Sequence, residues 1–268
     1  MVEFQRKDFY SYEDFLEIMR LLRAPGGCPW DREQTHGSIR RNFLEETYEV
    51  LDAIDHDDAH GMCEELGDVL MQVAFHAQIE TERGRFTMAD VVNGVAQKLV
   101  YRHPHVFGDV QADTSQQVLN NWEVLKRREK GQRSTADAVE SVPHTLPALW
   151  RAEKIQSKTA KAGFDWSSAL RALDKLEEEV RELRAALESG QAPDAPHGVR
   201  EELGDTLFMA AKIAQMSGVD PEDALHRACD KFDRRFRAVE EAADKPLSEC
   251  GEAELLALWN DAKSHDPS

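Results

Sequence analysis

The hydrophobic residues in the first half of the chain recur every three or four positions, as in helices that bury one face. In residues 11–23, Phe15, Met19 and Leu22 follow this spacing, and Pro25-Gly26-Gly27 ends the pattern. No stretch shows the strict alternation of apolar and polar residues that is typical of a half-buried strand. The same helical spacing predicts four further helices, at residues 38–54, 58–82, 87–104 and 115–129.

The helical period fails over residues 130–147, which are rich in Gly, Ser, Thr and Pro. We interpret this segment as a boundary between domains. A second polar break, at residues 189–198, is interpreted as a loop inside the second half, and Asp220-Pro221 is a strong helix start. The prediction is a first helical domain at residues 1–130, a linker at 131–147 and a second helical domain at 148–268.

The two halves contain an internal repeat. The stretch Glu64-Glu65-Leu66-Gly67-Asp68 returns letter for letter at Glu201-Glu202-Leu203-Gly204-Asp205, 137 residues later (201 − 64 = 137). Upstream of it, Glu45-Glu46-Thr47-Tyr48-Glu49 matches Glu178-Glu179-Val180-Arg181-Glu182. Further matches pair Lys98 with Lys231, Arg102 with Arg235, Trp122 with Trp259 and Lys126 with Lys263. The chain therefore consists of two copies of one helical module.

Acidic residues in each copy are spaced to meet between two helices. Glu46 and Glu49 are three positions apart on one predicted helix, and Glu65 and Asp68 have the same spacing on the next. Two antiparallel helices would bring the four carboxylates together, where they repel one another unless a cation lies among them. Carboxylate oxygens of this kind suit Mg²⁺ or Mn²⁺, which share their remaining positions with substrate phosphates.

Glutamates on a helix more often form a solvated face than a metal site. Two observations argue against that interpretation here. Glu46 lies at the edge of the apolar stripe, between Phe43 and Val50, and Glu179 has the same position between Leu176 and Leu183. A carboxylate at the border of the core is costly to desolvate without a partner. The second observation is that the whole acidic pattern occurs twice.

The balance of charge excludes two classes of partner. The chain has 33 Lys and Arg against 51 Asp and Glu, a net charge of −18, so it lacks the cations that a stable nucleic-acid complex or an anionic membrane surface requires. We expect no signal peptide and no membrane span, because no apolar stretch is long enough. The 4 cysteines form no Cys-x-x-Cys pair, which favours a reducing, cytoplasmic location.

The order of motifs resembles the MazG family of nucleoside triphosphate pyrophosphohydrolases in its tandem form. The resemblance is carried by Gly27-Cys28-Pro29-Trp30-Asp31, by the Glu-Glu-x-x-Glu and Glu-x-x-Asp pairs of both halves, and by the stretch 102–107. It implies an all-α fold of four-helix-bundle-like modules that dimerise. It further implies Mg²⁺-dependent hydrolysis of NTPs or dNTPs to the monophosphate and pyrophosphate, which would serve nucleotide-pool sanitation.

The resemblance also implies roles for individual residues, with the second module as the main catalytic candidate. The implied metal ligands are Glu179, Glu182, Glu202 and Asp205, and in the first module Glu46, Glu49, Glu65 and Asp68. Either Glu178 or Glu182 would accept the proton of the attacking water. The implied substrate contacts are Lys175, Lys231, Arg235 and Trp259, with Lys98, Arg102 and Lys126 at the related positions of the first module.

Several alternatives stay open. Alternatively, Lys231 and Arg235 could be ordinary surface cations, and Trp259 could be an aromatic residue of the core or of an interface. The protein as a whole could be a narrower pyrophosphatase, of the dUTPase-like or phosphoribosyl-ATP type. It could also be a helical regulator that binds nucleotide without catalysis. The tandem arrangement argues against the narrower enzymes, and the acids at the edge of the core argue against a regulator.

Overall fold

The computed structural model describes residues 2–129 and 131–266, and every regular element in these residues is a helix. The all-α prediction is confirmed. The chain separates into two compact units, Met1–Lys126 and Arg127–Ser268, and the division falls within helix α7 (Ser115–Glu129). In the described residues, no helix is both long and apolar enough to cross a bilayer.

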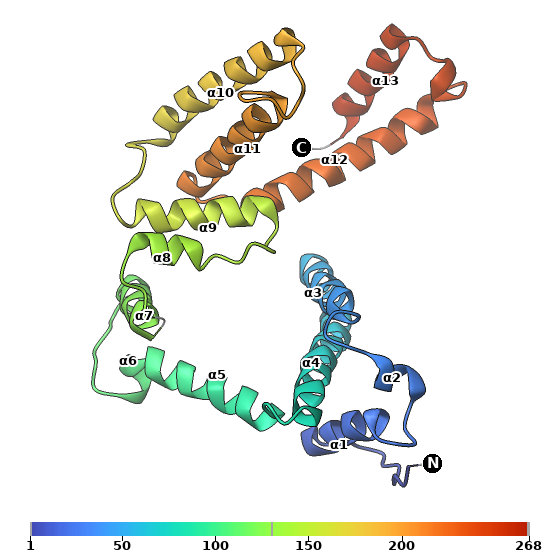
Figure 1. Cartoon of the computed structure of the whole chain (residues 1–268). Helices are drawn as coiled ribbons and strands as arrows, with labels where there is room; N and C mark the ends of the chain where they lie inside the picture. The colour runs from blue at the N-terminus through green and yellow to red at the C-terminus, as the bar shows by residue number, and fades with distance from the viewer. Residues whose placement is uncertain (1, 130, 267–268) are drawn as a thin grey trace. The chain divides into compact units, whose positions relative to one another are not determined.

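The first unit is organised around one long helix hairpin. Helices α3 (Arg40–Asp55) and α4 (Ala59–Glu82) pack along each other, and α1 (Tyr12–Arg23) packs on α4 (Figure 1). The unit also contains α2 (Pro29–Glu33), α5 (Met88–Arg102), α6 (Pro104–Phe107) and most of α7. The buried apolar cluster of this unit consists of Met19, Ile39, Ala74, Phe75 and Ile79.

The second unit repeats this order of helices. Helices α10 (Ala169–Ser189) and α11 (Val199–Met216) lie side by side, and α9 (Ala148–Ala160) packs on α11 (Figure 1). Helix α8 (Thr135–Glu140) packs on α9. Helix α12 (Pro221–Ala242) contacts α9 and α11, and a short 3₁₀ turn, η1 (Leu247–Glu249), leads to α13 (Glu252–His265), which packs back on α12.

The five helices predicted for the first half are present, with ends within two residues of those expected. Side chains cap the starts of three of them, α1, α4 and α5. The Asp58 side chain, for example, accepts hydrogen bonds from the backbone N–H groups of His60 and Gly61, both at 3.0 Å. The helix expected at 87–104 ends at Arg102, because Pro104 has no N–H to continue it.

The segment expected to be a linker, 131–147, contains α8, and the two units divide a few residues earlier than the expected boundary. This helix of six residues is too short for its apolar period to be recognised. Its start is set by a capping box, in which Ser134 Oγ accepts from the Asp137 N–H and the Asp137 carboxylate accepts from the Ser134 N–H. The expected loop at 189–198 does connect two helices, α10 and α11.

Candidate active site

Three carboxylates gather between the long helices of the second unit. Glu179 comes from α10, and Glu202 and Asp205 come from α11, three positions apart and therefore on one side of that helix. Oxygen atoms of the three side chains lie within 4.8 Å of one another. Glu179 is 6% exposed and Glu202 5% exposed, so two of the three acids are largely withdrawn from water.

Glu182, the fourth acid predicted for this group, lies one helical step further along α10. Partial desolvation raises the pKa of its carboxyl, and the nearby charges of Glu179 and Glu202 raise it further, against the lowering effect of Lys175. Carboxylates raise one another's pKa when they are held close together, because the charge of each disfavours ionisation of the next. All four predicted acids of the second unit are therefore neighbours.

Lys175 is the cation that lies closest to this group. Its Nζ is 2.7 Å from Glu178 Oε1 and 2.9 Å from Glu179 Oε1. These two contacts raise the pKa of the lysine, and the hydrogen bond from Lys175 is the main cause of the lowered pKa of Glu178. Of the two predicted proton acceptors, Glu178 is thus exposed and bound to a lysine, whereas Glu182 lies among the acids.

The first unit holds a similar group. Oxygens of Glu46 and Glu49 from α3 and of Glu65 from α4 lie within 4.8 Å of one another. Desolvation and then the charge of Asp68 raise the pKa of Glu46, and desolvation and then the charge of Glu49 raise that of Glu65. Gln72 Nε2 lies 3.5 Å from Glu46 Oε1 and is the polar neighbour of that half-buried acid.

The two acid groups differ in their cation. Lys175 lies four residues before Glu179, whereas the residue four before Glu46 is Asn42. The four acids are repeated between the units, but this lysine is not. A triphosphate brought to the acids would meet an ammonium group from this position of the hairpin in the second unit only.

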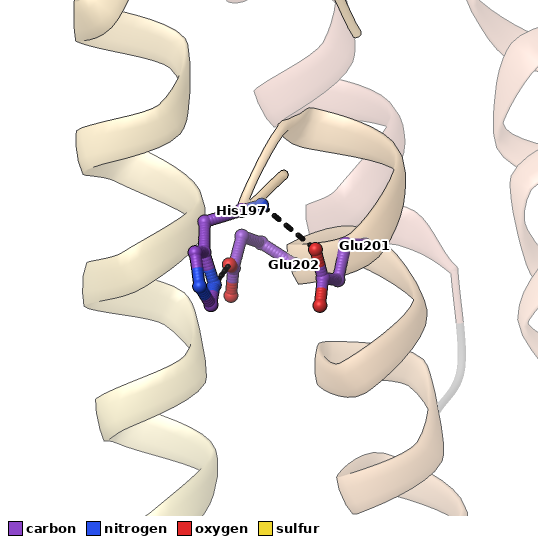
Figure 2. A group of neighbouring side chains, drawn as sticks. All are labelled: His197, Glu201 and Glu202. Carbon is purple, nitrogen blue, oxygen red and sulfur yellow. Dashed lines mark hydrogen bonds and ion pairs between the residues drawn. The ribbon is translucent and has the colours of Figure 1, made fainter. Parts of the chain in front are cut away.

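The structure adds a histidine that the sequence analysis missed. His197 precedes α11, and its Nδ1 lies 3.5 Å from Glu202 Oε1, while its backbone N–H donates to Glu201 Oε2 at 2.7 Å (Figure 2). Atoms of His197, Glu201 and Glu202 lie within 4.8 Å of one another. The internal repeat could have revealed this histidine, because the match of His60-Gly61 with His197-Gly198 extends the repeat four residues upstream.

The two matching histidines have different surroundings. His60 belongs to the first turn of α4, whereas His197 lies in the loop before α11 with a φ of 55°. A Cβ on the following Gly198 would come within 2.7 Å of the carbonyl oxygens of Pro193 and Ala195. The tight winding of this loop therefore requires glycine at 198 and brings His197 to Glu202.

The predicted substrate contacts of the second unit other than Lys175 lie on α12 and α13. Arg235 Nε is 2.8 Å from Asp266 Oδ2, and the Trp259 ring packs on Phe232 with centroids 5.2 Å apart. Lys231 is exposed. In the described part of the chain, no hydrogen bond or ion pair joins these three side chains to the acids, so their roles toward a substrate stay predictions.

The related residues of the first unit surround Trp122. The Arg102 guanidinium lies 5.2 Å and the Lys126 ammonium 4.4 Å from the centroid of this ring, both as cation–π contacts. Arg102 is buried and Lys98 is exposed. The two units therefore use their matching tryptophans differently, one between cations and the other against a phenylalanine.

Comparison with known proteins agrees with this geometry. A sequence profile of the MazG nucleotide pyrophosphohydrolase domain matches residues 34–107 and 167–239. A nucleoside triphosphate pyrophosphohydrolase/pyrophosphatase MazG of Thermotoga maritima is 42% identical, covering 95% of this chain and 96% of the relative. A nucleoside triphosphate pyrophosphohydrolase of Escherichia coli strain K12 is 46% identical over 84% of this chain and 85% of its own length. The two profile matches include every acid of both groups and leave Trp259 and Lys126 outside.

Proposed function

Because the chain belongs to the MazG family of nucleotide pyrophosphohydrolases, we propose that it hydrolyses nucleoside triphosphates to the monophosphate and pyrophosphate with the help of Mg²⁺. The observation that carries the proposal is the pairing of two buried acids, Glu179 and Glu202, across the α10–α11 hairpin beside exposed Asp205. Burying several carboxylates together is costly, and Lys175, with one positive charge, offsets only part of their negative charge, which favours a site built for a metal ion.

The donor set fits a hard divalent cation. In the second unit Glu179, Glu182, Glu202 and Asp205 offer only oxygen atoms, as do Glu46, Glu49, Glu65 and Asp68 in the first. Mg²⁺ prefers such ligands together with water and phosphate oxygens, and Mn²⁺ accepts the same set. A bound Mg²⁺ supplies positive charge that neutralises phosphate oxygens and lowers the pKa of water.

The protein's own side chains bind the phosphates and accept the proton of the attacking water. In the reaction, water forms a bond to the α-phosphorus, the bond from that phosphorus to the bridging oxygen breaks, and pyrophosphate leaves. Lys175, already among the acids, donates to a phosphate oxygen of the substrate. Glu182 accepts the proton of the attacking water, because it lies next to Glu179 and Glu202, whereas Glu178 is exposed and bound to Lys175.

The more distant cations complete the substrate site in this proposal. Lys231 and Arg235 lie four residues apart on α12 and would contact the triphosphate, with Trp259 beside them on α13. Lys98, Arg102 and Lys126 have the corresponding places in the first unit. Arg235 would exchange its present partner, Asp266, for phosphate.

We further propose that the chain forms a homodimer. The support is a row of exposed apolar side chains that recurs in both units on the helix after the hairpin, namely Val92, Val95 and Leu99 on α5 and Leu225, Phe232 and Phe236 on α12. Contiguous apolar surface of this kind is typical of association sites. Leu99→Asp should shift the mass measured by sedimentation equilibrium from about twice 30.4 kDa toward the monomer. A wild-type protein that is monomeric at the same concentrations would contradict the proposal.

The cellular role that fits is sanitation of the nucleotide pool in the cytoplasm. The four cysteines are free thiols, as expected for a reducing compartment. A broad nucleotide range agrees with the tandem arrangement. The alternatives are a narrower pyrophosphatase, which would act on one nucleotide, and a regulator, which would bind nucleotide without turnover.

One product analysis separates these functions. The protein is incubated with each NTP and dNTP in the presence of Mg²⁺, and monophosphate, diphosphate, orthophosphate and pyrophosphate are resolved. Equimolar monophosphate and pyrophosphate from several nucleotides is the expected result. Turnover of a single nucleotide favours the narrower enzyme. Diphosphate with orthophosphate, or no turnover, contradicts the proposed function.

A further inference from the structure

The end of α13 brings a carboxylate to one of the predicted phosphate contacts. Asp266 directly follows this helix, and its backbone N–H donates to the carbonyl oxygen of Ala262 at 3.1 Å. Its Oδ2 lies 2.8 Å from Nε of Arg235 on α12. The side chains of Asp266 and Arg235 are 10% and 15% exposed, so the pair is largely withdrawn from water. The guanidinium that is predicted to bind phosphate is therefore already bound to an anion of the protein itself.

Arg234 is a second cation beside the same carboxylate. Its Nε lies 3.5 Å from Asp266 Oδ1, and its side chain is 59% exposed. Burial raises the pKa of Asp266, but the hydrogen bond from Arg235 and the charge of Arg234 outweigh this effect, and the pKa lies below the ordinary 3.8. Asp266 is therefore ionised at neutral pH and lies between two neighbouring arginines.

A carboxylate and a phosphate group use the same donors of a guanidinium. Both accept charge-assisted hydrogen bonds from its N–H groups, so each occupies a place that the other would take. The contact between Arg235 and Asp266 is therefore chemically similar to the phosphate contact that the proposed function assigns to Arg235. A triphosphate that approaches Arg235 meets a donor that is already paired, and the Asp266 carboxylate repels its negative charges.

Arg234 makes an exchange of partners possible. A largely buried carboxylate that loses its only cation is strongly destabilised, because its charge stays desolvated without compensation. Asp266 does not face this loss, since Arg234 stays beside it when Arg235 turns to a phosphate. The mostly exposed side chain of Arg234 has the room to shorten its present contact of 3.5 Å.

The internal repeat includes both positions of this ion pair. By the offset of 137 residues, Arg235 corresponds to Arg102 and Asp266 to Glu129 (266 − 137 = 129). Each unit thus has an arginine and an acid at these two positions, as it has the four acids of the hairpin. A chance surface contact would not be expected to recur in this way.

We propose that Asp266 competes with the triphosphate for Arg235 and so limits the affinity of the second unit for nucleotides. The inference rests on the proposed function and adds to it a regulation of the site by the chain itself. Without nucleotide, Asp266 binds Arg235. When the nucleotide binds, a phosphate takes this place and Asp266 keeps Arg234 alone. When the products leave, Asp266 pairs with Arg235 again, and this pairing favours their release.

The test removes the charge of the competitor and measures the affinity of the protein for phosphates. Asp266→Asn retains nearly the same side-chain shape without the charge. It should lower the KM for NTPs about 10-fold, as expected when a charge-assisted hydrogen bond no longer has to be broken. It should strengthen the binding of inorganic tripolyphosphate by a similar factor, measured by calorimetry in the presence of Mg²⁺.

Asp261→Asn is the matched control. It removes the same charge from α13, but Asp261 is exposed and its ion-pair partner is His265, at 3.6 Å. It should leave both quantities unchanged. In the background Arg235→Met, which itself weakens binding, Asp266→Asn should have no further effect, because the group for which it competes is absent.

Arg234→Met tests the inference in the opposite direction, and it serves if thermal unfolding shows that Asp266→Asn is not folded. It leaves Asp266 to Arg235 alone and should weaken tripolyphosphate binding, whereas Arg237→Met, which removes an exposed cation of the same helix, should not.

Two sets of results would overturn the inference. One is an unchanged or weaker affinity in Asp266→Asn, or a gain that Asp261→Asn equals or that persists without Arg235. The other is an equal effect of Arg234→Met and Arg237→Met. Because tripolyphosphate binding requires no turnover, these results stay distinguishable from a wild type that does not hydrolyse NTPs, which would contradict the proposed function instead.

Discussion

The ammonium group of Lys175 lies 2.9 Å from a carboxylate oxygen of the buried Glu179. The same ammonium lies 2.7 Å from Glu178, which faces solvent. Lys175 thus connects the acid group between the helices with the surface of α10. The first unit, with Asn42 at this position, has four equivalent acids without this cation.

Removing this lysine should affect metal and nucleotide in opposite directions. In Lys175→Met, Mg²⁺ added without nucleotide should bind several-fold more tightly, because a positive charge beside its ligands is lost. kcat/KM for NTPs should fall about 10- to 100-fold, since a charge-assisted hydrogen bond to phosphate is removed. Calorimetric titration and steady-state kinetics measure the two effects.

Lys154→Met is the control for Lys175→Met, because Lys154 is an exposed lysine of α9 in the same unit. It should change neither quantity. Weaker Mg²⁺ binding in Lys175→Met would show that the lysine supports the metal ligands and does not compete with the metal.

The two acid groups should contribute unequally to turnover. Glu179→Ala should lower kcat/KM at least about 100-fold, because loss of a metal ligand removes several kcal/mol of charge stabilisation in the transition state. Glu46→Ala should have a smaller effect, since its unit lacks the counterpart of Lys175. The product assay described above measures both. Equal and complete loss in the two variants would refute this division of labour.

The loop before α11 should tolerate no side chain at 198. In Gly198→Ala the new Cβ would meet the carbonyl oxygens of Pro193 and Ala195 at 2.7 Å and that of Ala192 at 3.1 Å, and backbone atoms cannot move away cheaply. We expect a loss of about 1–3 kcal/mol in the free energy of unfolding, measured by urea denaturation.

Gly204→Ala provides the matched control in α11. A Cβ at this position would meet no atom within 4 Å, and alanine favours a helix over glycine by about 0.5–1 kcal/mol. This variant should therefore be as stable as the wild type or more so. If Gly198→Ala were as stable as Gly204→Ala, the backbone could not pack as tightly around residue 198 as described here.

Acid should destabilise the first unit through Glu80. This carboxylate is 5% exposed, and it accepts hydrogen bonds from His36 Nε2 at 2.5 Å and from Arg85 at 2.6 Å. These bonds, that from His36 foremost, hold its pKa below the ordinary 4.5. A carboxyl whose pKa is lower in the folded state stabilises the fold above its unfolded pKa and loses this contribution as the pH falls.

Glu80→Gln should therefore be less stable than the wild type at pH 7 and lose less stability between about pH 5 and pH 3. Urea unfolding across this range measures the difference. Glu45→Gln, which removes an exposed carboxylate paired with Arg41, should follow the wild-type curve. Parallel curves for Glu80→Gln and the wild type would contradict the role given to Glu80.

The sequence predicted the long helices well because their signals are local. Apolar spacing over several turns, together with caps such as Asp58, defines a helix without knowledge of its neighbours. The short helices α2 and α8 were not predicted, since five or six residues contain too little of a period. The acids were recognised from their spacing and repetition, and the structure gathers those of each hairpin at one place.

Some features of the second unit could not be predicted from the sequence, for a physical reason. Gln156 and Lys212 are polar residues in amphipathic helices, and nothing in their spacing distinguishes a buried polar side chain from a solvated one. His197 was not recognised as a site residue because it lies in a loop, although the pair His-Gly occurs in both copies of the repeat. Burial depends on which elements pack over a residue, and this is a property of the whole unit.

By itself, then, the sequence determined the helical class, the duplication and the identity of the acids, because hydrogen bonding within helices and side-chain periodicity act over a few residues. Only the tertiary structure decided that Glu179 and Glu202 are buried together and that the ammonium group of Lys175 lies beside Glu179. These features depend on contacts between helices that are distant in the chain, where packing sets the desolvation of each charge.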